Sequence, residues 1–216
     1  KYDLENFKKY SSLISENDYV YYTAKIHGCN ARFVYSNGQM YCGSRTTWKH
    51  EPGIVITRKN TKTDEVIETI APNNSWWEAM RQNSWIKEWC QNNPDVVIYG
   101  EVFGSSIQGD KFHYGFKNGN LGVRIFDVLE NKQWVGFHGM KKNAKYEGLI
   151  LVPVLYEGVH DKELLYSLIE EYETSLDCGP NHIREGIVIK LQNERYDSKI
   201  GRVALKCVGR RYLERS

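Results

Sequence analysis

The chain has 216 residues, enough for one large domain or two small ones with a substantial core. Its hydrophobic fraction of 41% and its aromatic residues, 15 Tyr, 7 Phe and 6 Trp, exclude an intrinsically disordered chain. A formal net charge of +2 gives little support for nucleic-acid binding through bulk charge, so any such binding would need a local basic surface.

The cysteines limit the compartment and the kinds of site. They are odd in number, none lies in a C-x-x-C pair, and they stand at positions 29, 42, 90, 178 and 207. This usage argues against a zinc site or a disulfide framework and predicts a reducing, cytoplasmic location. A compact chain rich in Asn, Tyr and Lys is also compatible with a phage protein acting in the host cytoplasm. No apolar run approaches the roughly 20 residues that cross a bilayer, so no membrane partner is expected.

The first third of the chain predicts one helix followed by strands. Apolar residues at helical spacing predict a short amphipathic helix over residues 3–15. From Asp18 to Gly43 β-forming residues dominate, and Asn37-Gly38 separates two such runs, which is the strongest short hairpin signal. Residues 49–74 are polar and predict a surface loop that could contain a hairpin.

The remainder predicts two longer helices among further strands. Ser75 is placed to cap a helix over residues 76–91, and leucines at helical spacing predict another over 161–176. Strands are predicted at residues 95–103, 121–129, 150–156, 184–192 and 201–208. Because these elements lack regular βαβ alternation, we expect an α+β fold with antiparallel sheets, not a doubly wound one.

Lys25 is the first candidate for chemistry. It ends a β-rich run and is followed by Ile26-His27-Gly28, where the glycine allows backbone and ligand to approach closely. A lysine becomes a nucleophile when burial, neighbouring cations or a metal lower its pKa. The alternative is a surface lysine entering a turn.

Two carboxylates stand at predicted strand ends. Glu101 follows an apolar strand and is flanked by Gly100 and Gly104, so it could bind ribose hydroxyls or hold a metal. Glu185 opens a later strand, where it could face a divalent cation while Lys190 reaches towards phosphate. The alternative for each of these side chains is an ordinary solvated charge.

Lys206 and Phe126 sit inside otherwise apolar strands. A buried lysine is costly without a partner, so Lys206 could serve an anionic ligand, or it could point out of the sheet by alternation. Phe126 could stack on a purine, although core packing is the commoner role of a strand phenylalanine.

Taken together, these patterns resemble the nucleotidyltransferase motifs of the covalent lysyl-AMP superfamily, which comprises ATP-dependent ligases and mRNA capping enzymes. In chain order the resemblance runs through Lys25–Gly28 (motif I), Ser44-Arg45 (Ia), Tyr99–Gly104 (III), Phe126-Asp127 (IIIa), Glu185–Lys190 (IV) and Lys206 (V).

His27 and Asn30 narrow the resemblance. DNA ligases and capping enzymes usually carry Asp at the position of His27, whereas K-x-H-G followed by Asn is similar to the RNA ligase 2 family. The run from Phe103 to Gln108 also resembles RNA ligases of this group. The resemblance covers residues 5–214 and implies an adenylyltransferase domain. Its fold would be ATP-grasp-like, with antiparallel sheets flanked by helices and a nucleotide pocket between the sheets.

The resemblance implies covalent chemistry at Lys25, which would form a phosphoramidate with AMP from ATP. Glu185, with Glu101, would hold Mg²⁺ or Mn²⁺. His27 and Asp127 would support the pocket beside the nucleophile. Such a site fits phosphoryl transfer, in which positioning and charge neutralisation supply most of the catalysis.

Five further side chains would contact the nucleotide. The resemblance places Asn30 and Arg45, together with the acidic residue of motif III, around the ribose and the neighbouring phosphate. Phe126 would stack on adenine, and Lys190 and Lys206 would contact phosphate.

The implied activity is ATP-dependent RNA ligation in RNA repair. AMP would pass from the lysine to a 5′-phosphate RNA end, and a 3′-hydroxyl would displace AMP and seal the strand. The partners would be RNA ends on a monomeric enzyme, and the substrate could be a nicked duplex, a broken tRNA loop or a single strand. Alternatives are an ATP-dependent DNA ligase, a GTP-dependent capping nucleotidyltransferase or, in another class, an inactive nucleic-acid-binding module.

Two departures from the family pattern bear on individual contacts. Ala24 stands where relatives often have Glu, so another group would read the adenine edge. Motif V often has two alternating lysines, and here Arg210 or Arg211 could replace the second, or Lys206 could suffice alone. We expect residues 1–216 to form the nucleotidyltransferase domain, with a C-terminal accessory domain absent or truncated.

Overall fold

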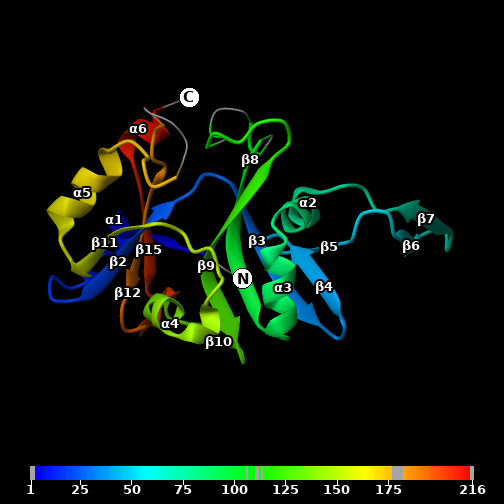
Figure 1. Cartoon of the computed structure of the whole chain (residues 1–216), viewed down its shortest axis with the longest axis horizontal. Helices are drawn as coiled ribbons and strands as arrows, with labels where there is room; N and C mark the ends of the chain where they lie inside the picture. The colour runs from blue at the N-terminus through cyan, green and yellow to red at the C-terminus, as the bar shows by residue number, and fades with distance from the viewer. Residues whose placement is uncertain (1–2, 106, 110–111, 113, 177–181, 215–216) are drawn as a thin grey trace.

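Two sheets face each other and form the body of the protein, as the computed structural model shows (Figure 1). The structure describes residues 3–105, 107–109, 112, 114–176 and 182–214. In spatial order the first sheet contains β1 (Glu5–Asn6), β15 (Ala204–Val208), β12 (Gly186–Leu191), β2 (Tyr19–Lys25) and β11 (Val154–Val159). The second contains β10 (Gln133–Val135), β9 (Leu121–Glu130), β8 (Val97–Gly104), β3 (Cys29–Ser36), β4 (Gln39–Gly43) and β5 (Trp48–Lys49).

All pairings within the two sheets are antiparallel except that of β1 with β15. The described helices are α1 (Phe7–Tyr10), α2 (Ser75–Gln82), α3 (Trp85–Asn92), α4 (Phe137–Lys142), α5 (Lys162–Glu170) and α6 (Arg210–Leu213), with 3₁₀ turns η1 (Ser11–Leu13) and η3 (Ala144–Tyr146). The expected α+β class with antiparallel sheets is therefore confirmed.

Strand alternation divides the core in two. Tyr21 on β2 joins a cluster with the second sheet, α2 and α3, while its neighbour Tyr22 joins a cluster between the first sheet and α5. On β12, Ile187 packs in the α5 cluster, and Val188 and Lys190 face the space between the sheets. Side chains that line a ligand cavity therefore alternate with side chains that stabilise the sheet.

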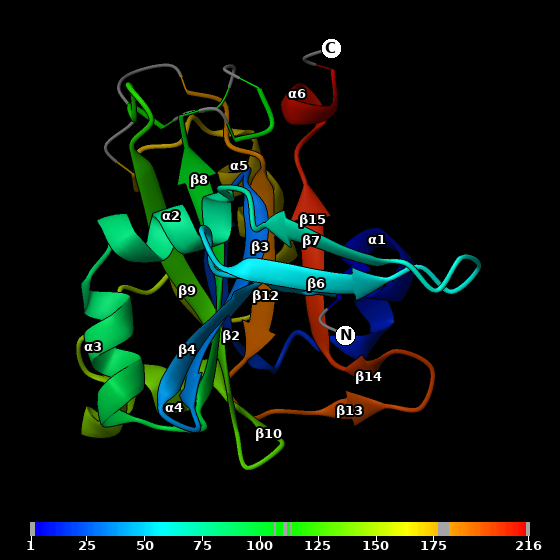
Figure 2. The same cartoon turned by 90° about the vertical axis from the view of Figure 1, so that its right-hand side faces the viewer.

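Two small hairpins lie outside the sheets. The polar segment 49–74 contains β6 (Val55–Lys59) and β7 (Val66–Ile70), and β13 (Tyr196–Asp197) pairs with β14 (Gly201–Arg202). In Figure 1 the β6–β7 hairpin extends away from both sheets, and Figure 2 views the molecule from that side. The predicted β3–β4 turn is also present, with positive φ at Asn37 and Gly38.

The expected helix over residues 3–15 is wrong. Asn6 caps α1 by accepting from the Lys8 backbone, and Glu5–Asn6 pair with β15, so the helix is only Phe7–Tyr10 before η1. The helix expected over 76–91 is two helices, and its cap is Asn74, not Ser75. Asn83 separates them because its side-chain amide donates to the carbonyls of Ala79 and Leu121.

Two other boundaries move because of tertiary contacts. The helix expected over 161–176 ends at Glu170. The Arg184 guanidinium donates to the Leu168 carbonyl and, over 3.0 Å, to the Tyr172 carbonyl, so these groups are not available to continue the helix. The strand expected from residue 150 begins at Val154, because residues 150–152 bond instead to Ile125 on β9. None of the described helices combines the length and apolar character required to cross a membrane.

A buried histidine gives this fold a predictable acid sensitivity. The Tyr22 hydroxyl lies 2.6 Å from Nδ1 of His160. Burial lowers the pKa of His160, although the negative charge of Asp18 acts in the other direction. The unfolded chain therefore binds a proton first, so the free energy of unfolding should fall as pH drops below about 6.5. Urea unfolding at about pH 7.5 and about pH 5.5 should show a smaller loss for His160→Gln than for the wild type. A matched change at the exposed His50 should leave the loss unchanged, and equal losses in all three proteins would contradict this assignment.

Candidate active site

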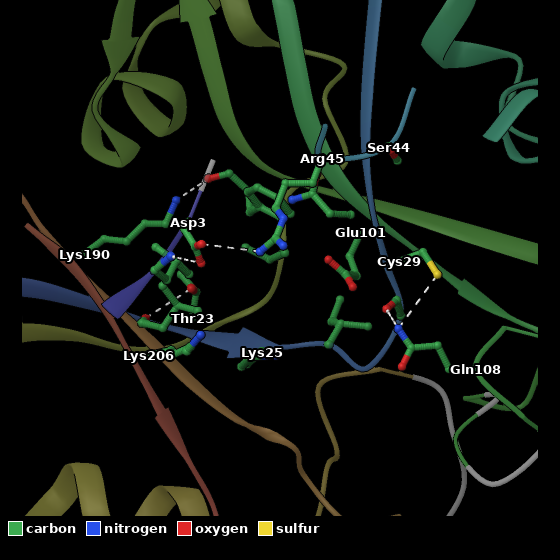
Figure 3. A pocket seen from close by; sticks show the side chains of 18 of the residues that line it. Asp3, Thr23, Lys25, Cys29, Ser44, Arg45, Glu101, Gln108, Lys190 and Lys206 are labelled. Atoms are coloured by element: carbon green, nitrogen blue, oxygen red, sulfur yellow. Dashed lines mark hydrogen bonds and ion pairs between the residues drawn. The ribbon is translucent and has the colours of Figure 1, made fainter. Parts of the chain in front are cut away.

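A cavity of about 480 Å³ lies between the two sheets (Figure 3). Seven of the ten residues selected from sequence line it: Lys25, Asn30, Arg45, Glu101, Phe126, Lys190 and Lys206. The other three, His27, Asp127 and Glu185, lie behind this lining, and Asp127 and Glu185 pair directly with lining lysines. The structure thus brings all ten together, while their individual roles stay predictions.

Lys25 ends β2 at the point where that strand pairs with the start of β12. The register aligns Lys25 with Gly186, so the preceding Glu185 accepts a hydrogen bond from the Lys25 ammonium. The side chains of Lys25 and Glu185 are 24% and 10% exposed, so this ion pair lies at the edge of solvent. The amine is both oriented and open to a ligand.

Gly28 allows the turn after Lys25 to lie directly on β8. A Cβ at Gly28 would lie 2.3 Å from the Val102 carbonyl oxygen and 2.9 Å from Cγ of Glu101. Only glycine fits this approach, which holds the Lys25 turn beside the Glu101 carboxylate.

Glu101 and Asn30 face the cavity as a cross-strand pair of β8 and β3. Burial raises the pKa of Glu101 to about 8; Lys25 opposes this shift and Glu185 adds to it. The side-chain oxygen of Asn30 is buried and has no hydrogen-bond partner within the described part of the chain. Both groups suit donors supplied by a ligand, such as hydroxyls, and the carboxylates also suit a cation.

Lys190 belongs to a buried chain of charges on the opposite wall. Its ammonium donates to Asp127 at 2.8 Å and to the Phe126 carbonyl, and Arg202 lies 2.9 Å from the same Asp127 oxygen. Arg202 is held in turn by two bonds to Glu194, at 2.6 and 2.7 Å. Burial lowers the pKa of Lys190 to about 8, although Asp127 opposes the shift. Asp127 therefore fixes Lys190 beside the Phe126 backbone.

Lys206 points into the cavity, because its neighbours Leu205 and Cys207 on β15 face the α5 cluster. Alternation along β15 thus turns Lys206 out of its sheet on the cavity side, and its contact with an anionic ligand stays a prediction. The pairing of Asn6 with Lys206 also brings the N-terminal segment to the cavity, where Asp3 lies 3.5 Å from NH1 of Arg45. No sequence pattern indicated that Asp3 would lie at this cavity.

Arg210 and Arg211, the alternatives for a second motif V lysine, lie away from the cavity, and the replacement stays a prediction. Arg211 donates to the Glu170 carbonyl at 3.0 Å and lies over the Tyr172 ring at 4.3 Å, while Arg210 pairs with Glu214 at 3.2 Å. Arg211 therefore packs against the end of α5 and the chain beyond it, while the Arg210 side chain is mostly exposed.

Two tyrosine hydroxyls hold His27. Tyr212 on α6 lies 2.5 Å from its Nδ1, and Tyr114 accepts its backbone N–H at 2.7 Å. Tyr114 has φ +49°, a strained conformation for a bulky residue, and stacks on His182 at 4.4 Å. His27 itself lies 4.0 Å from Glu185, so the tyrosines support the ion pair of Lys25 and Glu185 from behind.

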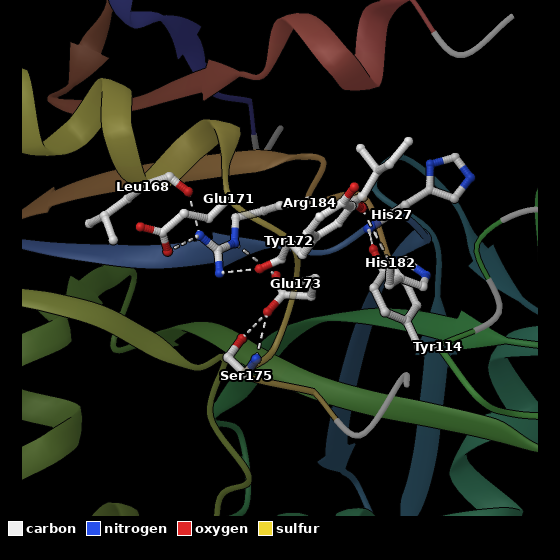
Figure 4. A network of polar contacts seen from close by, with 10 residues as sticks. His27, Tyr114, Leu168, Glu171, Tyr172, Glu173, Ser175, His182 and Arg184 are labelled. Carbon is white, nitrogen blue, oxygen red and sulfur yellow. Dashed lines mark hydrogen bonds and ion pairs between the residues drawn. The ribbon is translucent and has the colours of Figure 1, made fainter. Parts of the chain in front are cut away.

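Arg184 fixes the chain next to Glu185 (Figure 4). Its guanidinium is 2% exposed and pairs with the equally buried Glu173 at 3.3 Å and with Glu171 at 3.7 Å. It also bonds the end of α5, as described above. Removing Arg184 or Glu173 would take away the buried partner of the other charge, so this segment is held strongly.

Sequence reasoning missed several lining and supporting groups. Trp76 lines the cavity and donates to the Asn30 carbonyl at 2.9 Å, and Gln108 donates to the Gly28 carbonyl at 2.5 Å. Gln108 was within a quoted motif but had no assigned role. Ser106 of that motif lies outside the described residues, as does Cys178. The four described cysteines are free thiols.

Glu101 and Glu185 are the candidate metal ligands. The described residues contain no cluster of three or more His, Cys, Asp or Glu side chains that could hold a metal. Mg²⁺ usually binds one or two carboxylates together with water and substrate phosphates. The two carboxylates near Lys25 therefore fit Mg²⁺ or Mn²⁺ brought with a nucleotide.

A family model described as RNA ligase matches residues 18–208. Three solved structures of RNA ligase from Naegleria gruberi are similar to this chain. A mutant with ATP and Mn has 22% identity, a TM-score of 0.70 and coverage of 100% of this chain and 58% of that one. The protein with PPi has 23% identity, a TM-score of 0.70 and coverage of 99% and 57%.

A further mutant with AMP and Mn has 21% identity, a TM-score of 0.69 and coverage of 100% and 57%. The chain thus spans less than two thirds of the length of these structures. At this level of identity, the three structures show the fold. No curated protein matches the chain.

The hydroxyl that holds His27 can be tested by its contribution to stability. Tyr212→Phe should lower the free energy of unfolding by about 1–3 kcal/mol, because a buried ring nitrogen loses its partner. Urea denaturation measures this loss. Tyr196→Phe, on a 61% exposed residue, is the matched control and should change stability by less than about 0.5 kcal/mol. Equal effects of the two changes would contradict the role of Tyr212.

Proposed function

The chain belongs to the RNA ligase family, and from this premise we propose that it is an ATP-dependent RNA ligase acting through a covalent lysyl-AMP. One observation carries the proposal. The Lys25 amine donates to the Glu185 carboxylate at the solvent edge of the cavity. Gly28, three residues later, allows the following turn to lie against Glu101.

In the first step the Lys25 amine attacks the α-phosphorus of ATP. A nitrogen–phosphorus bond forms, and the bond from phosphorus to the pyrophosphate oxygen breaks. Attack requires a free lone pair on nitrogen, so the Lys25 ammonium must first give up a proton. Glu185, which accepts its hydrogen bond, is placed to receive that proton and orients the nitrogen at the cavity edge. Positioning of this kind supplies a large part of the rate enhancement of phosphoryl transfer.

The cavity offers complementary groups for each part of ATP. Phe126 would stack on adenine, and Asn30 would accept from ribose. Arg45 and Lys206 would contact phosphate from the two facing sheets. Lys190 lies beside Phe126, and its phosphate contact remains a prediction. Glu101 and Glu185 would hold Mg²⁺ or Mn²⁺, which supplies charge neutralisation at the phosphates when bound.

The later steps concern RNA. AMP would be transferred to a 5′-phosphate end, and a 3′-hydroxyl would then attack this adenylylated end, releasing AMP and sealing the strand. The family match favours RNA ends over the DNA-ligase and capping alternatives. The gathering of Lys25, Glu101 and Glu185 around one cavity favours an active enzyme over a silent binding module. Nicked duplexes, a monomeric state and a cytoplasmic location belong to the same proposal.

Labelling with α-³²P-ATP tests the first step directly. The protein with Mg²⁺ should acquire an acid-labile covalent label, and chelation of the metal should abolish it. Lys25→Ala should remove the label, whereas Lys199→Ala, on the exposed β13–β14 turn, should retain it. A label that persists in Lys25→Ala, or no label on the wild type, would defeat the proposal. Labelling by GTP in place of ATP would support the capping alternative.

A further inference from the structure

A second cavity, of about 590 Å³, lies along the outer edge of β4 and β5. We call it the edge cleft. Among the residues that line it are the aromatic Tyr41 and Trp48 and the basic Lys49, His50 and Lys87. None of these five side chains lines the ATP cavity proposed above.

Trp48 is held in a fixed position, although its residue is 44% exposed. A Cβ at Gly43 would lie 2.8 Å from the indole Cε3, so the glycine makes room for the ring on the sheet. The Arg32 guanidinium lies 4.2 Å from the ring centroid and donates through Nε to the Ser44 carbonyl at 2.8 Å. Tyr41 packs edge-on against the same indole at 6.1 Å. The indole is therefore pre-organised, with Arg32 over the ring and the exposed part of the ring left for stacking.

The edge cleft begins where the ATP cavity ends. Arg45 and Thr46 line the ATP cavity, and Trp48, two residues later, lines the edge cleft. Lys49 connects the two regions, because its ammonium lies 4.8 Å from the ring centroid of Trp76, which lines the ATP cavity. A strand whose end reaches Lys25 could therefore continue into the edge cleft.

Charge also distinguishes this region in a chain with a net charge of only +2. Arg32 lies over the Trp48 indole, and Lys49 and Lys87 line the same cleft, whose acidic lining residue is Glu51. Aromatic faces combined with cations are typical of sites for single-stranded nucleic acid, because bases stack and phosphates pair with the cations.

We propose that the edge cleft binds an unpaired segment of the RNA substrate, with one base stacked on Trp48 and the backbone near Lys49 and Lys87. This proposal rests on the proposed function, since it places the strand whose end is sealed at Lys25. A single strand is specified because a base paired within a duplex does not offer a free face for stacking on an indole.

Binding of RNA without ATP tests the edge cleft. The probe is a 5′-phosphorylated single-stranded RNA of about 12 nucleotides, within the size range of single-strand sites. Fluorescence anisotropy should show a loss of affinity of about 5- to 100-fold for Trp48→Ala, as expected for one lost stacking contact. Trp48→Phe should restore most of it. Lys87→Ala should reduce the slope of log affinity against log salt concentration by about one.

Matched controls make the outcome specific. Tyr196→Ala removes another exposed aromatic and should bind as the wild type. Three results would each overturn the proposal. Trp48→Ala could bind the single-stranded RNA as tightly as the wild type, Tyr196→Ala could lose as much affinity as Trp48→Ala, or Trp48→Ala could lose as much affinity for blunt duplex RNA. Covalent labelling of Lys25 by ATP should be unchanged in Trp48→Ala. Loss of this label in Trp48→Ala would contradict the claim that the edge cleft is separate from the ATP cavity. If the wild type binds RNA through Trp48 but is never labelled by ATP, the ligase function fails while the cleft stands.

Discussion

The site depends on the pairing of β2 with β12. This antiparallel register joins Lys25 to Glu185, two residues separated by 160 positions in sequence. The same two strands direct Val188 and Lys190 into the space between the sheets and bury Ile187 on the other side. A slip of one residue would exchange these faces, so the apolar contacts with α5 also protect the geometry of the ion pair.

Charges behind the cavity are buried in partnered sets. Asp127 is shared by Lys190 and Arg202, and Arg184 is compensated by Glu173. Buried ion pairs add little net stability compared with apolar packing, and breaking one partner is costly. Their contribution here is position: each fixes the backbone beside a residue that faces the ligand. The cavity between the sheets is thus lined by side chains whose supports have little freedom to move.

Sequence patterns predicted the elements that local chemistry determines. The Asn37-Gly38 hairpin and the α+β class are present, as are the strands that carry Lys25 and Glu101. The predicted helix ends were wrong where a side chain distant in sequence bonds to the backbone carbonyls, as Arg184 does at the end of α5. Tyr114 and Tyr212 could not be found, because nothing local connects either residue with His27. The orientation of Arg211 likewise depends on packing against Tyr172.

The bond between Tyr212 and His27 has a consequence for synthesis of the protein. It joins residues 185 positions apart, so the turn that follows Lys25 is translated early and receives this support only when α6 emerges. At ordinary elongation rates this interval is roughly 10 to 40 s. A nascent chain released before α6 would contain Lys25, both candidate metal ligands and most of both sheets, yet lack the contact between Tyr212 and His27. The order of translation therefore places the support of the Lys25 turn after the synthesis of both sheets.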